Sequence, residues 1–436
     1  MTADMSGKSS IPGASPAKKN KDAKILAVIA VLTLMFMLGM LFLFLAPFII
    51  PFAVMYPYKV CPIIWYPEQG IVYCCGPKGE KVWGTADPNM TKAEIRPGTT
   101  FINENAFQRS SRLTEVTLPD SLTVINTRAF ADCSAIRTVK LSDKVTVIEE
   151  QAFSRCQALE SINIPNGATA IGPKAFEFCS SLKEVKIPDS VTSVGHSAFS
   201  FCSSLRSVNI PLGITEIPEA MFWECKSLKS FVTPQHVTKI GPLAFAGCSG
   251  LESVTLHDKI TVISGSAFAG CTGLKTFAIP RTVTEIENNA FQGCSGIKSI
   301  SIPPQVRKIG KYAFSRSGLT SAAVPDTVKE LDDAVFYGCK HLRTAVLPKD
   351  LQIINEHMFS GCVNLKSVEI PRKVRSIRWQ AFCDCTGLTS VTIPDSVTYI
   401  ERQAFLGCTN LKTASVPKHT ELVDEVFPKH TKIIRR

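Results

Sequence analysis

The sequence predicts a solenoid of about 14 stacked coils, in which short parallel β-strands alternate with loop or 3₁₀ arcs, preceded by one transmembrane helix. Three observations support this fold class. A sequence unit returns about every 23 residues, each unit alternates apolar and polar residues over a short run, and a 22-residue apolar stretch lies near the N-terminus.

Phenylalanine marks the repeat most clearly. Successive members of the row lie 23 residues apart except for two steps of 22, after Phe314 and Phe405. The row comprises Phe107, Phe130, Phe153, Phe176, Phe199, Phe222, Phe245, Phe268, Phe291, Phe314, Phe336, Phe359, Phe382, Phe405 and Phe427. A fixed period of this length is typical of a repeat protein.

Each unit divides into a strand and an arc. The run Leu-x-x-Val-x-Ile-Pro ends in alternating apolar and polar residues, which favours a short strand with one buried face that stops at the proline. The following Val-x-x-Ile-x-x-x-Ala-Phe spaces its apolar residues three to four apart, which favours a loose helical or 3₁₀ arc. One coil cannot bury its apolar side alone, so stacking is required, and it gives a length of roughly 65 to 70 Å.

The unit resembles that of the BspA-like leucine-rich-repeat family, whose units run Cys/Asn-x-x-Leu-x-x-Ile-x-Leu and end in Ala-Phe. The resemblance covers residues 101–427 and implies a leucine-rich-repeat solenoid in a cell-surface or secreted recognition or adhesion protein. Local departures replace the Cys, the Pro or the Ala of the unit, at Ser110, Ser317, Ser142, His257 and Val335.

The N-terminal region is not part of the repeat. We expect a basic cytosolic tail at 1–24, a transmembrane anchor with a proline-kinked exit at 25–55, a neck and N-terminal cap at 56–100, and the solenoid with its C-terminal cap at 101–436. Residues 25–46 carry no charge and are long enough to span a bilayer core of about 30 Å. Lysines at 18, 19, 21 and 24 place the N-terminus in the cytosol, so the solenoid is extracellular or lumenal.

A cleaved signal peptide is the alternative interpretation of this stretch. Signal sequences have apolar regions of about 7 to 15 residues, whereas here the next charge after the stretch is Lys59. A retained anchor is therefore the preferred interpretation, with Pro47 and Pro51 ending or kinking the helix.

The neck carries two features that matter on the lumenal side of a membrane. Asn89-Met90-Thr91 is an N-glycosylation sequon, which gives mild support to a lumenal position. Cys61, Cys74 and Cys75 lie between the anchor and the first coil. A disulfide there would brace an N-terminal cap, and free thiols are an equally good interpretation.

The other cysteines follow the repeat. Twelve lie three residues after a repeat phenylalanine and should form one stacked column: Cys133, Cys156, Cys179, Cys202, Cys225, Cys248, Cys271, Cys294, Cys339, Cys362, Cys385 and Cys408. Stacking places their Cβ atoms about 4.8 Å apart, too far for a disulfide, which predicts free, buried thiols. Cys383 falls outside the column and is expected to point outward.

Catalysis requires several chemically different residues at one place, and the repeat does not bring such a set together. The seven histidines share no repeat position, and no glycine-rich phosphate loop or zinc motif occurs in the sequence. We therefore predict a non-enzymatic protein without cofactor or metal site.

A candidate binding surface emerges seven residues after the phenylalanines. This position holds nine basic residues against Glu160 and Glu252, and it accounts for most of the excess charge outside the tail. The basic residues are Arg137, Lys183, Arg206, Lys229, Lys275, Lys298, Arg343, Lys366 and Lys412. The next position is almost always Ser or Thr, from Thr138 to Thr413. Such rows suit an extended protein or acidic glycan partner; the alternative is that they only keep the sheet soluble.

These patterns together predict a single-pass membrane protein whose solenoid serves recognition or adhesion through its concave strand face. The alternative function is a membrane-tethered intracellular scaffold, which needs the opposite topology and would make free thiols natural. Aromatic residues are absent from the basic and hydroxyl rows, which argues against nucleic acid as a partner.

Overall fold

The computed structural model describes residues 64–66, 71–74 and 89–436, and all of them belong to one compact unit that spans 60–436. The predicted tail at 1–24 and the predicted anchor at 25–55 lie outside the described residues. Among the residues that are described, no helix is long and apolar enough to cross a membrane.

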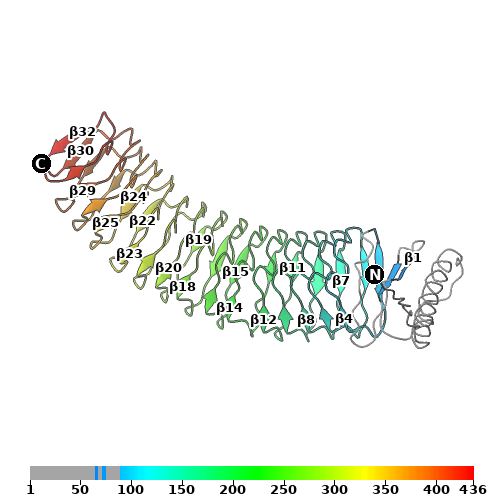
Figure 1. Cartoon of the computed structure of the whole chain (residues 1–436). Coiled ribbons are helices and arrows are strands. Elements are labelled where there is room, and N and C mark those ends of the chain that lie inside the picture. Colours follow the sequence, from blue (N-terminus) through cyan, green and yellow to red (C-terminus); the bar gives the residue numbers. More distant parts are fainter. Residues whose placement is uncertain (1–63, 67–70, 75–88) are drawn as a thin grey trace, which may run out of the picture. The chain divides into compact units, whose positions relative to one another are not determined.

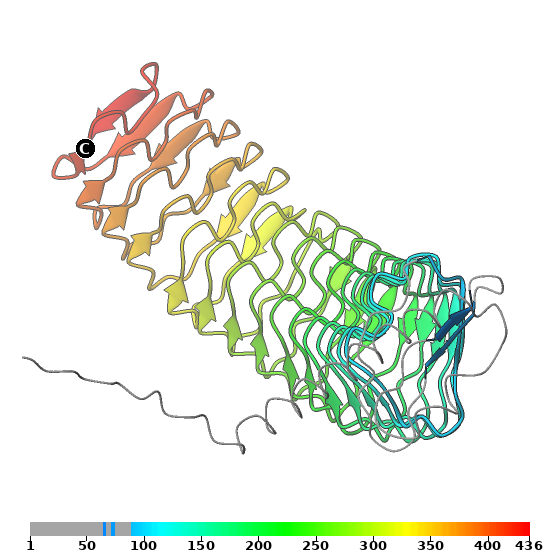
Figure 2. The same cartoon turned by 45° about the vertical axis from the view of Figure 1, so that its right-hand side comes forward.

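The described chain forms a parallel β-solenoid of about 15 turns, which confirms the predicted architecture of stacked coils. Figure 1 shows the coils following one another in sequence order, from β4 to β32, and Figure 2 shows the same order from a second direction. Two ladders of strands run along the solenoid, and we call them the first and the second ladder.

The first ladder is formed by the predicted strand of each coil. The middle residue of most of its strands is buried and its flanking residues are exposed, as the alternating sequence requires. Its strands are β3 Lys92–Ile95, β5 Glu115–Thr117, β7 Thr138–Lys140, β9 Ser161–Asn163, β11 Glu184–Val185, β13 Ser207–Val208, β15 Ser230–Val232, β17 Ser253–Thr255, β19 Thr276–Phe277, β22 Ser321–Ala323, β24 Thr344–Val346, β26 Ser367–Val368, β28 Ser390–Thr392, β30 Thr413–Val416 and β32 Lys432–Arg435.

The second ladder was not predicted. Two-residue parallel strands occupy the part of each arc that we expected to be helical or 3₁₀. They are β4 Phe101–Ile102, β6 Val124–Ile125, β8 Val147–Ile148, β10 Ala170–Ile171, β12 Ser193–Val194, β14 Glu216–Ile217, β16 Lys239–Ile240, β18 Val262–Ile263, β20 Glu285–Ile286, β21 Lys308–Ile309, β23 Glu330–Leu331, β25 Ile353–Ile354, β27 Ser376–Ile377, β29 Tyr399–Ile400 and β31 Glu421–Leu422. The described residues contain no 3₁₀ helix, so the 3₁₀ part of the prediction was wrong.

Turns joined by hydrogen bonds between coils make up the rest of each arc. The N–H of Phe130 donates to the carbonyl of Ala152 in the next coil (2.8 Å), while the N–H of Cys133 donates within its own coil to the carbonyl of Phe130 (3.3 Å). This alternation requires left-handed residues on both sides of the phenylalanine, such as Arg128 (φ 54°) and Asp132 (φ 61°). Each coil thereby satisfies its buried backbone groups without a helix.

The repeat phenylalanines form the centre of the core. They are almost fully buried, and successive rings are stacked, with centroids from 4.9 Å apart for Phe382 and Phe405 to 6.3 Å for Phe199 and Phe222. Truncating a buried phenylalanine to alanine usually costs about 3 to 5 kcal/mol. The row therefore stabilises each coil mainly through its two neighbours.

The twelve cysteines after the phenylalanines form the predicted column of free, buried thiols. Each thiol donates to the backbone carbonyl of the repeat phenylalanine one coil earlier, for example Cys133 Sγ to Phe107 O at 3.0 Å and Cys156 Sγ to Phe130 O at 3.2 Å. The prediction for Cys383 was wrong. Its side chain is only 7% exposed, because the residue directly after Phe382 still packs inside the arc.

Threonine lines the second ladder in most coils. From Thr123 to Thr284 the residue before each two-residue strand is Thr, and most of these hydroxyls donate to the carbonyl of the equivalent residue one coil earlier. The column is interrupted from Arg307 to Arg375 and returns at Thr398 and Thr420, so the chemistry of this edge changes over the coils between.

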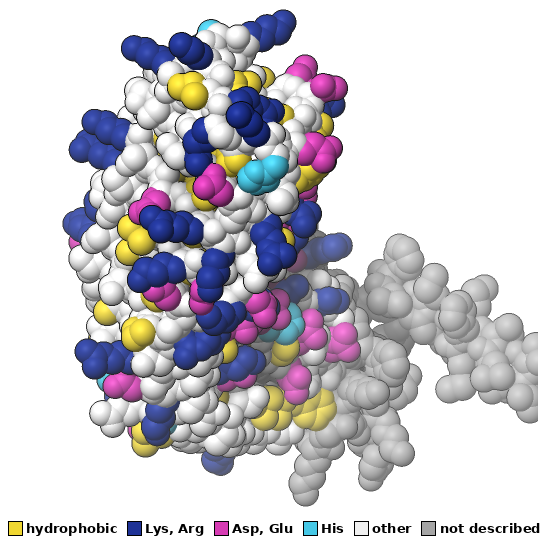
Figure 3. Space-filling view, turned by 90° about the vertical axis from the view of Figure 1, so that its left-hand side faces the viewer, with side chains coloured by type: hydrophobic (Ala, Val, Ile, Leu, Met, Phe, Trp, Pro, Cys, Tyr) yellow, Lys and Arg dark blue, Asp and Glu magenta, His cyan; other side chains and the backbone are white. Residues whose placement is uncertain are grey.

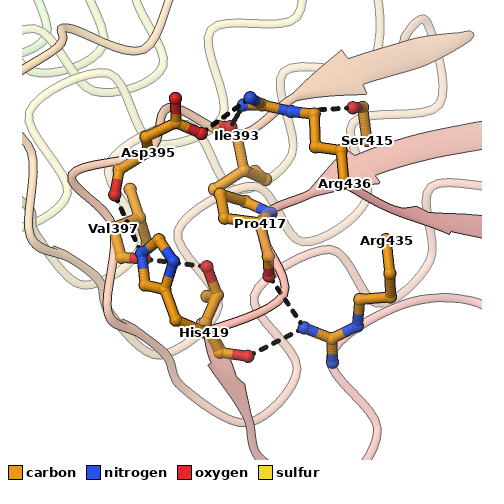
Figure 4. A network of polar contacts seen from close by, with 9 residues as sticks. Ile393, Asp395, Val397, Ser415, Pro417, His419, Arg435 and Arg436 are labelled. Atoms are coloured by element: carbon orange, nitrogen blue, oxygen red, sulfur yellow. Dashed lines mark hydrogen bonds and ion pairs between the residues drawn. The ribbon is translucent and has the colours of Figure 1, made fainter.

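The two ends of the described solenoid are built differently, and the last strand, β32, is exposed at the edge of its sheet. At the N-terminal end, β1 Ile64–Tyr66 pairs antiparallel with β2 Ile71–Cys74, and β2 pairs in parallel with β3. At the C-terminal end, Arg436 bonds to the carboxylate of Asp395 (2.7 Å), the hydroxyl of Ser415 (3.1 Å) and the carbonyl of Ile393 (Figure 4). Arg435 donates to two further carbonyls. The two arginines at the end of the chain therefore bind the last strand to the preceding coils.

Candidate functional site

Eight of the nine basic residues lie directly before a strand of the first ladder, Lys298 lies shortly before the isolated bridge at Ser301, and all nine side chains are exposed. We call them the basic row. Backbone hydrogen bonds between coils hold the row in register: the N–H of Arg206 donates to the carbonyl of Lys183 (2.8 Å), and that of Lys366 to Arg343 (2.9 Å). The predicted residues are therefore brought together on one edge of the solenoid.

The two glutamates in the same row neutralise part of it. Glu160 lies between Arg137 (3.3 Å) and Lys183 (2.7 Å). The hydrogen bond and the charge of Lys183, with a smaller effect of Arg137, hold the pKa of the Glu160 carboxyl below its ordinary value. Ion pairs this exposed stabilise a protein very little, so their main effect is on the local charge.

Glu252 has the same role near the middle of the solenoid. Its carboxylate lies 3.5 Å from Lys229 and 3.3 Å from Lys275, and the hydrogen bond from Lys275 is the main cause of its lowered pKa. Four of the nine basic residues thus have an acidic neighbour within the row.

The remaining positive charge is concentrated toward the C-terminus. Within the part of the chain that the structure describes, the side chains of Arg206, Arg343, Lys366 and Lys412 form no ion pair, and Lys298 donates only to the carbonyl of Ser295 (3.1 Å). Figure 3 looks onto the C-terminal side and shows many Lys and Arg side chains there, with carboxylates between some of them. The C-terminal half of the row therefore offers unpaired cations to a ligand.

The outward positions of the strands complete this surface. The hydroxyl row from Thr138 to Thr413 lies at the start of the strands and is exposed in nearly every coil. Two positions further along, Val232 and Val346 are 60% and 62% exposed. The surface thus combines cations, hydroxyl groups and a few apolar contacts.

The predicted neck residues are only partly visible. Cys61 and Cys75 lie outside the described residues, and Cys74 ends β2 without a described side chain. Asn89 is exposed shortly before β3. Among the described residues, no group of three or more His, Cys, Asp and Glu side chains could hold a metal ion.

An aromatic cluster on the arcs was missed by the sequence analysis. Tyr312, Tyr337, His357 and Trp379 form a chain of edge-to-face contacts with centroid distances of 6.1, 6.1 and 4.6 Å. These residues lie two before, one after, two before and three before their repeat phenylalanines, so they share no single repeat position. Only an analysis that compared neighbouring positions across coils could have found them.

The comparisons with known proteins agree with this fold. The family described as "BspA type Leucine rich repeat region (6 copies)" matches residues 100–229, 215–343 and 331–435. A leucine-rich repeat protein from Bacteroides ovatus is 22% identical, covers 86% of this chain and 94% of its own, and has a TM-score of 0.56.

Two further solved structures are more distant in shape. A leucine rich cell surface protein from Faecalibacterium prausnitzii is 29% identical over 64% of this chain and 87% of its own, with a TM-score of 0.47. A leucine-rich repeat protein from Eubacterium ventriosum is 20% identical over 78% and 90%, with a TM-score of 0.46. No curated protein matches the sequence. Because the family match extends over most of the sequence, the chain belongs to the BspA type leucine-rich repeat family.

Proposed function

We propose that this protein is a non-enzymatic recognition or adhesion protein that binds an extended, negatively charged partner along the first ladder. The observation that carries the proposal is the set of unpaired, exposed cations in the C-terminal half of the basic row, Arg343, Lys366 and Lys412. These side chains stand beside the exposed hydroxyl row, so carboxylate or sulfate groups could receive both charged and neutral hydrogen bonds.

An extended partner suits this surface better than a compact one. Neighbouring coils repeat at the strand spacing of about 4.8 Å, so the cations form a line rather than a pocket. A linear acidic glycan or an acidic segment of a protein could contact several coils at once, and the contributions of successive contacts would accumulate.

Charge-neutralising variants test this proposal. We expect heparin, used as a linear acidic probe, to retain the wild-type protein, and the triple variant Arg343→Gln, Lys366→Gln, Lys412→Gln to elute at clearly lower salt, because each lost contact reduces the number of displaced counterions. The matched control is Arg137→Gln, Lys183→Gln, Lys275→Gln, which removes the same charge from paired positions and should have a smaller effect. Equal elution of the two triple variants would refute the assignment to the C-terminal half.

The glutamates provide a second test in the opposite direction. Glu160→Gln and Glu252→Gln together should free four paired cations and strengthen heparin retention, because the row then carries fewer competing carboxylates. Unchanged or weaker retention would mean that the N-terminal half of the row does not take part in binding.

We further propose that residues 25–55 anchor the protein in a membrane with the N-terminus in the cytosol and the solenoid outside or in the lumen. A relative from Faecalibacterium prausnitzii that bears the description of a cell surface protein supports a surface location. Digestion of a tag after Arg436 by protease added to intact cells, together with a mobility shift in Asn89→Gln, is the expected result.

The intracellular scaffold is the second candidate function. The thirteen free, buried cysteines among the described residues suit a reducing compartment. A tag that is digested only after the plasma membrane is opened, with no mobility shift in Asn89→Gln, would favour this scaffold over the surface protein.

A further inference from the structure

We propose that the arcs between Tyr312 and Trp379, with the groove beside them, form a binding site for a neutral oligosaccharide, separate from the basic row. The groove has a volume of about 550 Å³. Two neighbouring coils line it, with Glu330 and Asp332 from one and Gln352 and Asn355 from the next, and a third coil contributes Lys373. This size lies within the range of small-ligand sites.

The groove belongs to the second ladder, on a different edge of the coils from the basic row. It contains β23 and the first residue of β25, and Figure 1 places these strands on the outer side of the bend, whereas β22 and β24 follow its inner side. The threonine column that covers this edge in earlier coils is replaced here by Arg307, Lys329 and Gln352. The edge is therefore chemically distinct where the groove lies.

Most charges in the groove already have partners. Asp350 lies 2.6 Å from Lys373 and 3.7 Å from Lys329, and Glu330 lies 3.9 Å from Lys308. The lining residues carry two lysines against three carboxylates, so the net charge is only slightly negative. A strongly charged ligand would have to break these pairs, which favours an uncharged one.

The groove nevertheless retains hydrogen-bonding groups for such a ligand. The carboxylate of Asp332 makes no hydrogen bond or ion pair with any residue that the structure describes. Asn355 donates from its amide to the carbonyl of Leu331 (2.6 Å), which fixes the side chain and leaves its own oxygen as an acceptor. Carboxylate and amide oxygens that accept from hydroxyl groups are suited to a sugar.

The aromatic cluster continues directly from this groove. His357 follows Asn355 by two residues, a separation of at most about 7 Å along the chain. Tyr312 and Trp379 are 37% and 40% exposed, and the rings meet at 71° to 88° rather than stacking like the core phenylalanines. The guanidinium of Arg316 lies over the Tyr337 ring, 5.7 Å from its centroid, so the two exposed end rings, Tyr312 and Trp379, are the ones that can receive the C–H face of a pyranose ring.

The cluster spans several coils, which favours a chain of sugars over a single one. Tyr312 and Trp379 lie on arcs three coils apart, or about 14 Å at the strand spacing. The polar groove would receive hydroxyl groups along one side of that chain. The proposed ligand is thus an elongated, uncharged oligosaccharide.

The test uses the full chain and five hexasaccharides, maltohexaose, cellohexaose, chitohexaose, mannohexaose and xylohexaose, measured by calorimetry. We expect at least one to bind, and Trp379→Ala and Asp332→Asn each to weaken it at least tenfold. Trp223→Ala is the matched control, because Trp223 contacts Phe201 on a different part of the solenoid, and it should bind like wild type.

The conservative Asp332→Asn keeps the proposal testable should Trp379→Ala fail to fold, which a thermal melt will show. Absence of binding to all five sugars overturns the proposal, as does binding that Asp332→Asn leaves unchanged. A sugar whose binding is lost instead in the Arg343, Lys366 and Lys412 triple variant belongs to the basic row, and this result also overturns the separate site.

Discussion

Cysteine suits the position three residues after the phenylalanine because it is small, apolar and a weak hydrogen-bond donor. Its thiol reaches the phenylalanine carbonyl of the preceding coil, as Cys248 Sγ does with Phe222 O at 3.1 Å. Where serine replaces it at position 317, no bond to the preceding phenylalanine carbonyl forms among the described residues, and Ser317 Oγ lies instead 3.4 Å from Cys339 Sγ. At this one coil the replacement of the thiol by a hydroxyl thus changes the hydrogen bond between coils.

The buried thiols make stability sensitive to alkaline pH. Burial raises the pKa of Cys248 to about 12, above the value of about 8.5 in an unfolded chain. Because the folded pKa is the higher one, the unfolded state loses its proton first, so the stabilising effect is complete below pH 8.5 and disappears as the pH rises toward 12. Cys248 should thus contribute about 2 kcal/mol less to the free energy of unfolding at pH 10 than at pH 8.

Urea unfolding of the wild type and of Cys248→Ala at both pH values, with reductant present, measures this contribution. The difference between the two proteins isolates the thiol, because the lysines titrate equally in both. A difference that stays constant from pH 8 to pH 10 would show that the thiol is not held protonated by the fold.

At the scale of the coil, close approach of the backbones decides which residues are tolerated. A Cβ at Gly241 would lie 2.7 Å from the nitrogen of Glu219 and 2.8 Å from the carbonyl oxygen of Ile217 in the preceding coil. A Cβ at Gly265 would lie 3.5 Å from its nearest neighbour, the carbonyl oxygen of Asn288. Neither glycine has a positive φ. The two positions therefore differ in the space available for a Cβ atom and not in backbone conformation.

We therefore expect Gly241→Ala to destabilise the protein by about 1 to 3 kcal/mol, because two backbones must move apart. Gly265→Ala should change the free energy of unfolding by much less and serves as the control. Chemical denaturation of both variants provides the measurement. Equal losses would mean that the coils can separate locally at little cost.

The same scale shows what the sequence can predict. The strand at Thr138–Lys140 was predictable because Val139 is the single buried residue between two polar ones. The second ladder was not predictable, because Val145 and Ile148 have the three-residue spacing that is typical of a helix. The segment between them is nevertheless too short to form a helical turn. Inter-coil hydrogen bonds decide between the two structures, and no single coil contains them.

The binding surfaces show the same limit. The basic row was predictable because it recurs at one repeat position. Its pairing was not, because the ion pair of Lys183 with Glu160 joins residues 23 apart, and side-chain direction determines it. The cluster around His357 and Trp379 depends on contacts between different repeat positions, which a periodic analysis averages away.

On the scale of the whole molecule, each coil contacts mainly the coils beside it. Strand pairing in both ladders joins consecutive coils, and the phenylalanine rings stack only on their neighbours. Stability of such a protein is approximately a sum of coil and interface contributions. A local defect should therefore have a local effect, which an ordinary globular core does not allow.

Amide hydrogen exchange followed by mass spectrometry tests this expectation with two matched variants. Phe405 stacks on Phe382 (4.9 Å) and Phe427 (5.0 Å) near the C-terminal end, and Phe405→Ala should remove about 3 to 5 kcal/mol of packing there. We expect faster exchange in 382–436 and unchanged exchange in 107–200. Phe153→Ala, in a stack with Phe130 and Phe176, should raise exchange around its own coils and leave 382–436 unchanged. Faster exchange along the entire solenoid in both variants would show instead that the coils unfold as one cooperative unit, because the interfaces between coils would then outweigh the stability of any single coil.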